Sequence, residues 1–148
     1  MNKYMEMAIA LGQKGYSKHE VPIGAVIVKD GKVVGVGFNR REKTQNAIKH
    51  AEMIAIDKAC RKLKSWRLDD CELYVTLEPC PMCAGAIVNA RIKKVYIAAK
   101  QKTSEDNLCE NIFSSTRLNH KVDFEYLTDY EAQASKLLTD FFKNKRVP

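Results

Sequence analysis

Two short motifs, His50-Ala51-Glu52 and Cys80-Pro81-Met82-Cys83, constrain this chain more than any other feature of its sequence. One imidazole and two thiolates supply three ligands for zinc, and the fourth position stays open for water. Structural zinc sites close with four protein ligands, whereas three ligands with a nearby carboxylate indicate a catalytic metal whose acid and base is Glu52. The fold has to bring both motifs to one metal ion.

Each motif by itself allows other interpretations. A lone C-x-x-C also occurs in redox pairs of the thioredoxin type or as two buried thiols, and a lone H-x-E arises by chance in helices. Here Pro79 precedes Cys80, and the apolar run 73–77 indicates a buried strand that delivers the cysteines to the start of a helix. Together, H-x-E and P-C-x-x-C resemble the signature of zinc deaminases, which favours a metal site.

The spacing within each motif predicts where two helices begin. Cys80 and Cys83 are three residues apart, so both sulfurs lie on one face of a first helical turn, where the helix N-terminus favours thiolates. His50 and Glu52 are two apart and would diverge in the middle of a helix, so both reach one metal only where a helix begins. We therefore expect a helix from about residue 49 to 63.

Composition limits the class of protein. With 148 residues, of which 45% are apolar, the chain suffices for one sizeable core, and we expect a single domain over residues 1–148. No apolar stretch reaches the ~20 residues that span a bilayer, and no signal-peptide core is present, so we expect a cytoplasmic protein without membrane contact. Lys and Arg number 25 against 18 Asp and Glu, a net charge of +7. This balance favours a polyanionic partner, although an ordinary basic surface gives the same number.

Apolar periodicity predicts alternating strands and helices along the chain. We expect a helix over 4–14, hairpin strands over 24–28 and 33–37, a polar loop over 38–47, a strand over 72–77, a helix over 80–89, a strand over 94–98, a short helix near 108–113, a strand over 122–127 and a last helix from 128 or 129 into the basic tail. This alternation predicts an α/β sheet that is partly parallel. The long connection before the last strand predicts that this strand is parallel to its predecessor.

Several stretches resemble, in order, the tRNA-specific adenosine deaminase family of the cytidine deaminase-like zinc deaminases. They are EVPIGA (20–25), GFNR (37–40), HAE (50–52), LYVTLEPC (73–80), MCAGA (82–86), NH (119–120) and LLTDFF (137–142). The resemblance covers nearly the whole chain. It implies a three-layer α/β/α sandwich with a five-stranded mixed sheet, a homodimer, and hydrolytic conversion of adenosine to inosine at the wobble position of a tRNA anticodon loop.

The resemblance also implies roles for single residues. His50, Cys80 and Cys83 would hold one zinc ion per chain, and Glu52 would carry the proton to the base and then to the departing ammonia. Asn39 matches an asparagine that hydrogen-bonds the target nucleotide, although an Asn after a strand is also typical of a plain turn. Further substrate contacts are implied for Val21, Pro22 and Ala51 as walls of the base pocket, for Glu78 beside the first cysteine, and for Phe142 and Arg146 on the last helix.

One segment departs from the family pattern. Residues 98–107 contain no glycine, and Gln101 stands near the place of an aspartate that helps to hold the anticodon loop in the family. Two interpretations stay open for Gln101: a hydrogen bond to a ribose or phosphate, or a position in a surface loop. The departure bears on the substrate and leaves the metal chemistry unchanged.

Three functions are therefore weighed. The first is a zinc-dependent deaminase of adenosine in tRNA, where the anticodon loop offers an unpaired base. The second is a deaminase of free nucleobases or nucleosides of the guanine, cytosine or adenosine type, which needs no basic footprint. The third is a noncatalytic RNA-binding subunit, against which Glu52 argues. The glycine-free segment favours the second function, whereas Asn39, the basic tail and the parallel last strand favour the first.

Overall fold

The computed structural model describes residues 1–101 and 107–145. Its elements are α1 (Lys3–Ser17), β1 (Gly24–Lys29), β2 (Lys32–Phe38), α2 (Arg41–Thr44), α3 (Ala51–Leu63), β3 (Cys71–Leu77), α4 (Pro81–Asn89), β4 (Lys94–Ala99), α5 (Leu108–Ser114), β5 (Asp123–Tyr126), the 3-10 turn η1 (Thr128–Tyr130) and α6 (Glu131–Lys145). Each expected strand and helix is present. The expected polar loop over 38–47 is different, because it contains the short helix α2.

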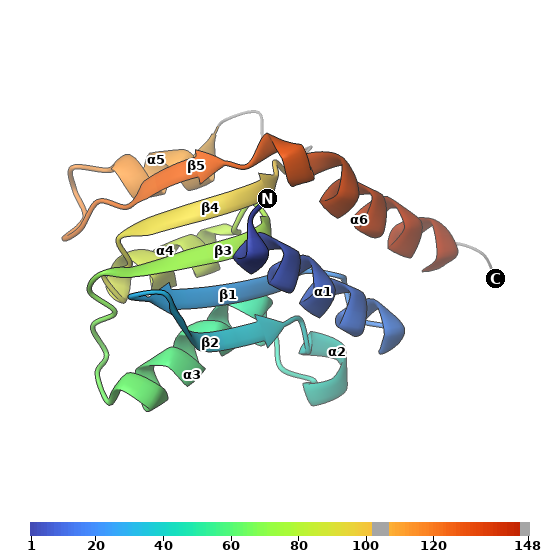
Figure 1. Ribbon diagram of the computed structural model, residues 1–148, viewed down its shortest axis with the longest axis horizontal. Helices are drawn as coiled ribbons and strands as arrows, with labels where there is room; N and C mark the ends of the chain where they lie inside the picture. The colour runs from blue at the N-terminus through green and yellow to red at the C-terminus, as the bar shows by residue number, and fades with distance from the viewer. Residues whose placement is uncertain (102–106, 146–148) are drawn as a thin grey trace.

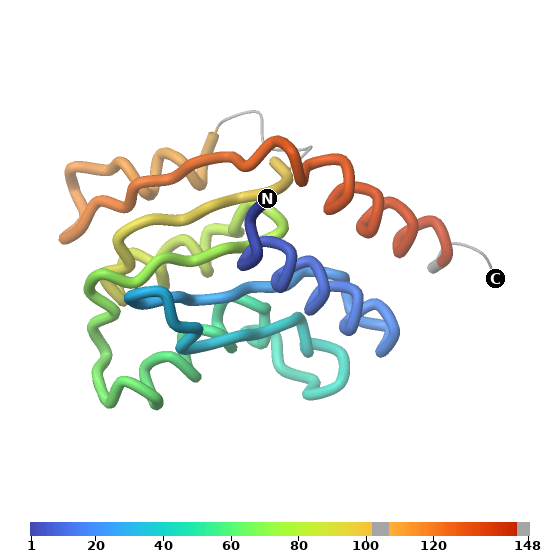
Figure 2. The backbone as a smooth tube through the Cα atoms, viewed as in Figure 1, coloured from blue at the N-terminus to red at the C-terminus, as the bar shows by residue number. Residues whose placement is uncertain are grey.

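The strands form one mixed sheet in the order β2-β1-β3-β4-β5 (Figure 1). Strand β1 is antiparallel to both β2 and β3, whereas β3, β4 and β5 are mutually parallel. The parallel direction of the last strand is therefore confirmed. Parallel neighbours need crossover connections, and the backbone trace shows them (Figure 2). Along the chain, α4 connects β3 to β4, and α5 lies in the connection from β4 to β5.

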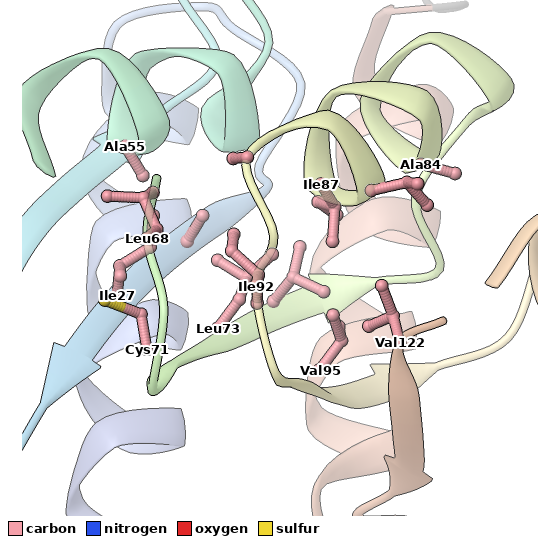
Figure 3. Packing of buried hydrophobic residues seen from close by; sticks show 14 of the residues in the cluster. Ile27, Ala55, Leu68, Cys71, Leu73, Ala84, Ile87, Ile92, Val95 and Val122 are labelled. Carbon is pink, nitrogen blue, oxygen red and sulfur yellow. The ribbon is translucent and has the colours of Figure 1, made fainter. Parts of the chain in front are cut away.

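Helices cover both faces of the sheet, so the expected three-layer sandwich is confirmed. On one face, Leu73 and Val95 of the strands pack against Ala55 of α3 and Ile87 of α4 in the larger apolar cluster (Figure 3). On the other face, α1 and α6 pack on a second cluster that includes Tyr74. Among the described residues, no helix combines the length and apolar character needed to cross a membrane.

Two glycines let α3 lie directly on β2. A Cβ atom on Gly35 would overlap the carbonyl oxygen of Ala55, and a Cβ on Gly37 would overlap that of Ala51. Side chains at these positions would push the helix away from the strand. The glycines of β2 therefore fix the depth at which α3, and with it His50, sits against the sheet.

We expect Gly37→Ala to lower the free energy of unfolding by about 2–3 kcal/mol, because the new methyl group meets backbone that cannot move aside. The matched control is Gly15→Ala in α1, where an added Cβ would meet only side-chain atoms, at 3.4 Å or more. At this helical position alanine should be neutral, or stabilising by up to about 1 kcal/mol. Urea unfolding of both variants measures the difference, and equal stabilities would show that α3 is not held by its contact with Gly37.

Candidate active site

Two helices begin at the same place, at the carboxyl ends of the parallel strands. His50 is the N-cap residue of α3, and Cys80, which follows β3 closely, is the N-cap residue of α4. Both have extended backbone, and neither side chain caps its own helix. The Nδ1 atom of His50 lies 3.6 Å from the sulfur of Cys80 and 3.6 Å from that of Cys83.

These three side chains form a group that could hold a metal ion. Their ligand atoms all lie within 4.8 Å of one another. The pKa of Cys80 is lowered to about 5, mainly by a hydrogen bond from Cys83 and also by His50, while burial opposes the shift. The same bond to Cys80, together with burial, raises the pKa of Cys83. A cation bound between the two sulfurs would stabilise both as thiolates.

Glu52 lies beside this group, on the first turn of α3, and its side chain is only 4% exposed. The pKa of Glu52 is raised to about 7, mainly because the carboxyl group is buried and also because of the charge of Cys80. Hydrogen bonds with its own backbone N–H and with Cys83 partly oppose this rise. A carboxyl group in this environment can hold a proton and release it near neutral pH.

A cavity of about 750 Å³ opens above the group. It is lined by Val21, Ile23, Asn39, Arg41, His50, Ala51, Glu52, Leu77, Glu78, Cys80, Ala99, Lys100, Gln101, Ser135, Leu138, Thr139, Phe142 and Lys143. The structure thus brings together most residues that the sequence singled out, from segments spread over the whole chain. Their roles in binding and catalysis stay predictions.

Three of the singled-out residues are not among those that line the cavity. Cys83 is fully buried behind the cavity, where its sulfur still reaches the metal-binding group. Pro22 is buried and is not among the lining residues, unlike Val21 and Ile23 on either side of it, and its carbonyl group faces Gly12 of α1. A contact of Pro22 with the base stays a prediction. Arg146 lies outside the described residues.

Asn39 is held in a defined orientation at the cavity wall. Its side chain is 6% exposed, and its Oδ1 atom accepts a hydrogen bond of 3.0 Å from the backbone N–H of Arg41. With the oxygen engaged in this way, the NH2 group of the amide is left to donate a hydrogen bond. Asn39 thus offers the cavity a donor.

Glu78 ties the segment after β4 to the segment that presents Cys80. Its backbone N–H donates to the carbonyl of Ala99 at 2.8 Å, and its buried carboxylate accepts the backbone N–H of Gln101 at 3.2 Å. Gln101 therefore lines the cavity, at the start of the segment that departs from the family pattern.

The outer wall contains residues to which the sequence analysis gave no role. One side of α6 supplies Ser135, Leu138 and Thr139 together with the predicted Phe142. These positions recur three or four residues apart, which is a helical stripe that the sequence could have indicated. The cations Arg41, Lys100 and Lys143 also line the cavity. They belong to basic clusters that are visible in the sequence, but nothing in the sequence placed them around one opening.

Comparison with known proteins agrees with this geometry. The family model of the MafB19-like deaminases matches residues 1–146. The tRNA-specific adenosine deaminase of Aquifex aeolicus (strain VF5) is 42% identical over 144 residues, which cover 97% of this chain and 94% of the relative. The tRNA-specific adenosine deaminase of Bacillus subtilis (strain 168) is also 42% identical, over 97% of this chain and 89% of the relative.

Two solved structures extend the comparison to the fold. One comes from a study of A-to-I editing by tRNA:A34 deaminases at the wobble position of transfer RNA; it has a TM-score of 0.84 and 36% identity, covering 92% of this chain and 99% of that chain. The other is a guanine deaminase from Bacillus subtilis, with a TM-score of 0.67 and 32% identity, covering 100% of this chain and 96% of that chain. Both similarities extend over nearly the entire cytidine deaminase-like fold.

We expect Cys83→Ser to lower metal affinity by at least about tenfold, because a hydroxyl group is a poorer ligand than a thiolate. Elemental analysis of the purified variant, compared with the natural protein, measures this loss. Cys60→Ser is the matched control, because Cys60 is remote from the group, in the last turns of α3. Equal metal content in the Cys83 variant and the natural protein would contradict the ligand assignment.

Proposed function

Because this chain belongs to the tRNA-specific adenosine deaminase family, we propose that it hydrolyses adenosine to inosine at the wobble position of a tRNA anticodon. The observation that carries this proposal is the combination of a buried metal-binding group and Glu52 at the floor of the cavity with cations around its wall. Arg41, Lys100 and Lys143 come from three separate parts of the chain. A free base carries no phosphate for such cations, whereas a nucleotide within RNA carries one on each side.

We propose zinc as the resident metal, held by His50, Cys80 and Cys83. Tetrahedral zinc with ordinary Zn–N and Zn–S bonds would place nitrogen and sulfur ligands roughly 3.6 Å apart, which agrees with the two observed distances of 3.6 Å. When bound, zinc supplies the Lewis acidity that activates water for attack on the base. Soft thiolates with an imidazole are also the ligands that zinc prefers.

Glu52 performs the proton transfers in this proposal. Its carboxylate accepts a proton from the attacking water and delivers it to N1 of the adenine ring, while oxygen bonds to C6. It then takes the proton of the new hydroxyl group on C6 and delivers it to the amino group, which leaves as ammonia when its bond to C6 breaks and the C6 carbonyl of inosine forms. The buried environment that raises the pKa of Glu52 suits a group that has to accept and release a proton in one cycle.

The remaining contacts are assigned from the cavity wall and, for Arg146, from the family resemblance. The NH2 group of Asn39 donates to an acceptor on the target nucleotide. Phe142, which is 44% exposed on α6, offers a ring on which a neighbouring base can stack. Gln101 contacts a ribose or phosphate, and Arg146, outside the described residues, contacts a phosphate. Val21 and Ala51 form the walls around the base.

A deaminase of free bases or nucleosides is the second candidate. It is favoured by the similarity to the guanine deaminase structure, at 32% identity, and by the absence of glycine from residues 98–107. Fold and metal chemistry are shared between the two candidates, so the substrate has to be decided by the outer wall. There the cations favour RNA.

We also propose that the chain forms a homodimer through the outer side of α4. Gly85 lies in the middle of this helix, where glycine costs about 1 kcal/mol relative to alanine. Apart from the adjoining backbone of α4, none of the described residues has an atom within 4 Å of an added Cβ. Met82 and Ala86 of the same helix are partly exposed, as is Met53 on α3. Close approach of another chain is a reason to keep a glycine there.

We further propose that the chain forms a single domain and that it acts in the cytoplasm, where tRNA is processed.

The proposed reaction is tested by incubating the purified protein separately with a tRNA anticodon stem-loop, adenosine, guanine and cytosine. We expect inosine in the RNA and little product from the free compounds, with mass spectrometry as the measurement. Glu52→Gln should lose about 10²–10⁴-fold in rate, because it cannot act as an acid or base, and should keep its metal. Deamination of guanine or a free nucleoside, with intact RNA, would select the second candidate.

The dimer is tested with Gly85→Arg, which we expect to shift the protein to a monomer by placing a long cation in the contact. Sedimentation velocity measures the mass. Ala10→Arg is the matched control, because Ala10 is an exposed small residue within a helix on the opposite face of the sheet. If both variants keep the mass of the natural protein, α4 does not form the contact.

A further inference from the structure

Glu20 is a buried carboxylate with no ionic partner. Its side chain is 1% exposed, and it takes part in none of the ion pairs formed within residues 1–101 and 107–145. Burial of a carboxylate is costly unless hydrogen bonds replace its lost hydration. The chain turns inward at this point, because His19 adopts a left-handed conformation (φ 63°) and the N–H of Glu20 returns to the carbonyl of Gly15.

The carboxylate of Glu20 holds the start of α2. Its Oε1 atom accepts the backbone N–H of Glu42 at 3.1 Å, and its Oε2 atom accepts that of Lys43 at 2.8 Å. The preceding N–H, on Arg41, is accepted by Asn39 at 3.0 Å. Side-chain oxygens thus satisfy successive N–H groups that a helix N-terminus would otherwise leave without partners.

Helix α2 depends on these bonds. It spans only four residues, and none of them is buried. A helix this short has no independent stability, since nucleation costs more than so few internal hydrogen bonds return. It nevertheless carries Arg41 on the cavity wall and follows directly after Asn39. Two proposed substrate contacts therefore depend on an element that a remote carboxylate holds in place.

We infer that Glu20 is a positioning residue for substrate recognition. It fixes the N-terminus of α2, α2 presents the N–H of Arg41 to the Oδ1 atom of Asn39, and this bond keeps the NH2 group of Asn39 aimed at the nucleotide. Glu20 touches no substrate itself. The inference rests on the proposed function for its effect on catalysis, whereas its effect on α2 can be measured independently.

The test is Glu20→Gln in the full chain, which keeps the size of the side chain but turns one acceptor into an NH2 group that faces an N–H. We expect kcat/KM for the anticodon stem-loop to fall about tenfold, mainly through KM, with metal content unchanged. Hydrogen exchange in the peptide that covers 40–46 should become faster, while exchange in α3 and β3 stays the same. Glu42→Gln is the matched control, because it makes the same charge change on the exposed surface of α2 without removing an acceptor from the N-terminus.

Coupling to Asn39 separates positioning from general stability. If Glu20 acts through Asn39, adding Glu20→Gln to Asn39→Ala should lower kcat/KM by no more than about twofold. The inference would be overturned if the losses of kcat/KM in the two single variants multiplied in the double variant. It would also be overturned if hydrogen exchange over 40–46 did not change in Glu20→Gln. If the natural protein deaminates no RNA, the proposed function fails, but faster exchange confined to 40–46 would still support the role of Glu20 in holding α2.

Discussion

The active site depends on two helix N-termini that meet at one point. N-cap residues usually use their side chains to accept hydrogen bonds from the first N–H groups of the helix. His50 and Cys80 occupy N-cap positions but make no such bonds, so their side chains are free to face each other. The contact requires α3 to lie against β2 at the depth that its glycines set, and α4 to start directly after β3.

Asn39, Glu52 and Glu78 are buried polar residues that line the cavity above this point. Among the described residues, the buried charged or polar side chains are Glu20, Asn39, Glu52, Thr76 and Glu78. Backbone N–H groups satisfy Glu20 and Glu78, and in both cases the bond holds a neighbouring segment at the cavity. Glu52 differs, because burial raises its pKa to about 7. Similar carboxylates therefore serve as supports in two places, and in the third the environment suits the proton carrier that we propose.

Floor and wall of the cavity come from different parts of the chain. The floor is built from the starts of α3 and α4, whereas the wall is built from α2, the end of β4 and α6. A change in the wall can alter the substrate without disturbing the metal-binding group. This division is consistent with the comparisons, because the fold is similar both to a structure from a study of tRNA:A34 deaminases and to the structure of a guanine deaminase.

The sequence by itself determined the strands and helices, the parallel direction of the last strand, and the three residues that converge as a metal-binding group. These follow from spacing, because apolar periodicity and motif geometry are local properties. Tertiary structure alone decided that α2 forms within an apparent loop, that Pro22 faces α1, and that Arg41, Lys100 and Lys143 share one opening. Each of these depends on contacts between distant segments: a carboxylate at Glu20 stabilises a helix more than twenty residues later, and no local pattern contains that bond.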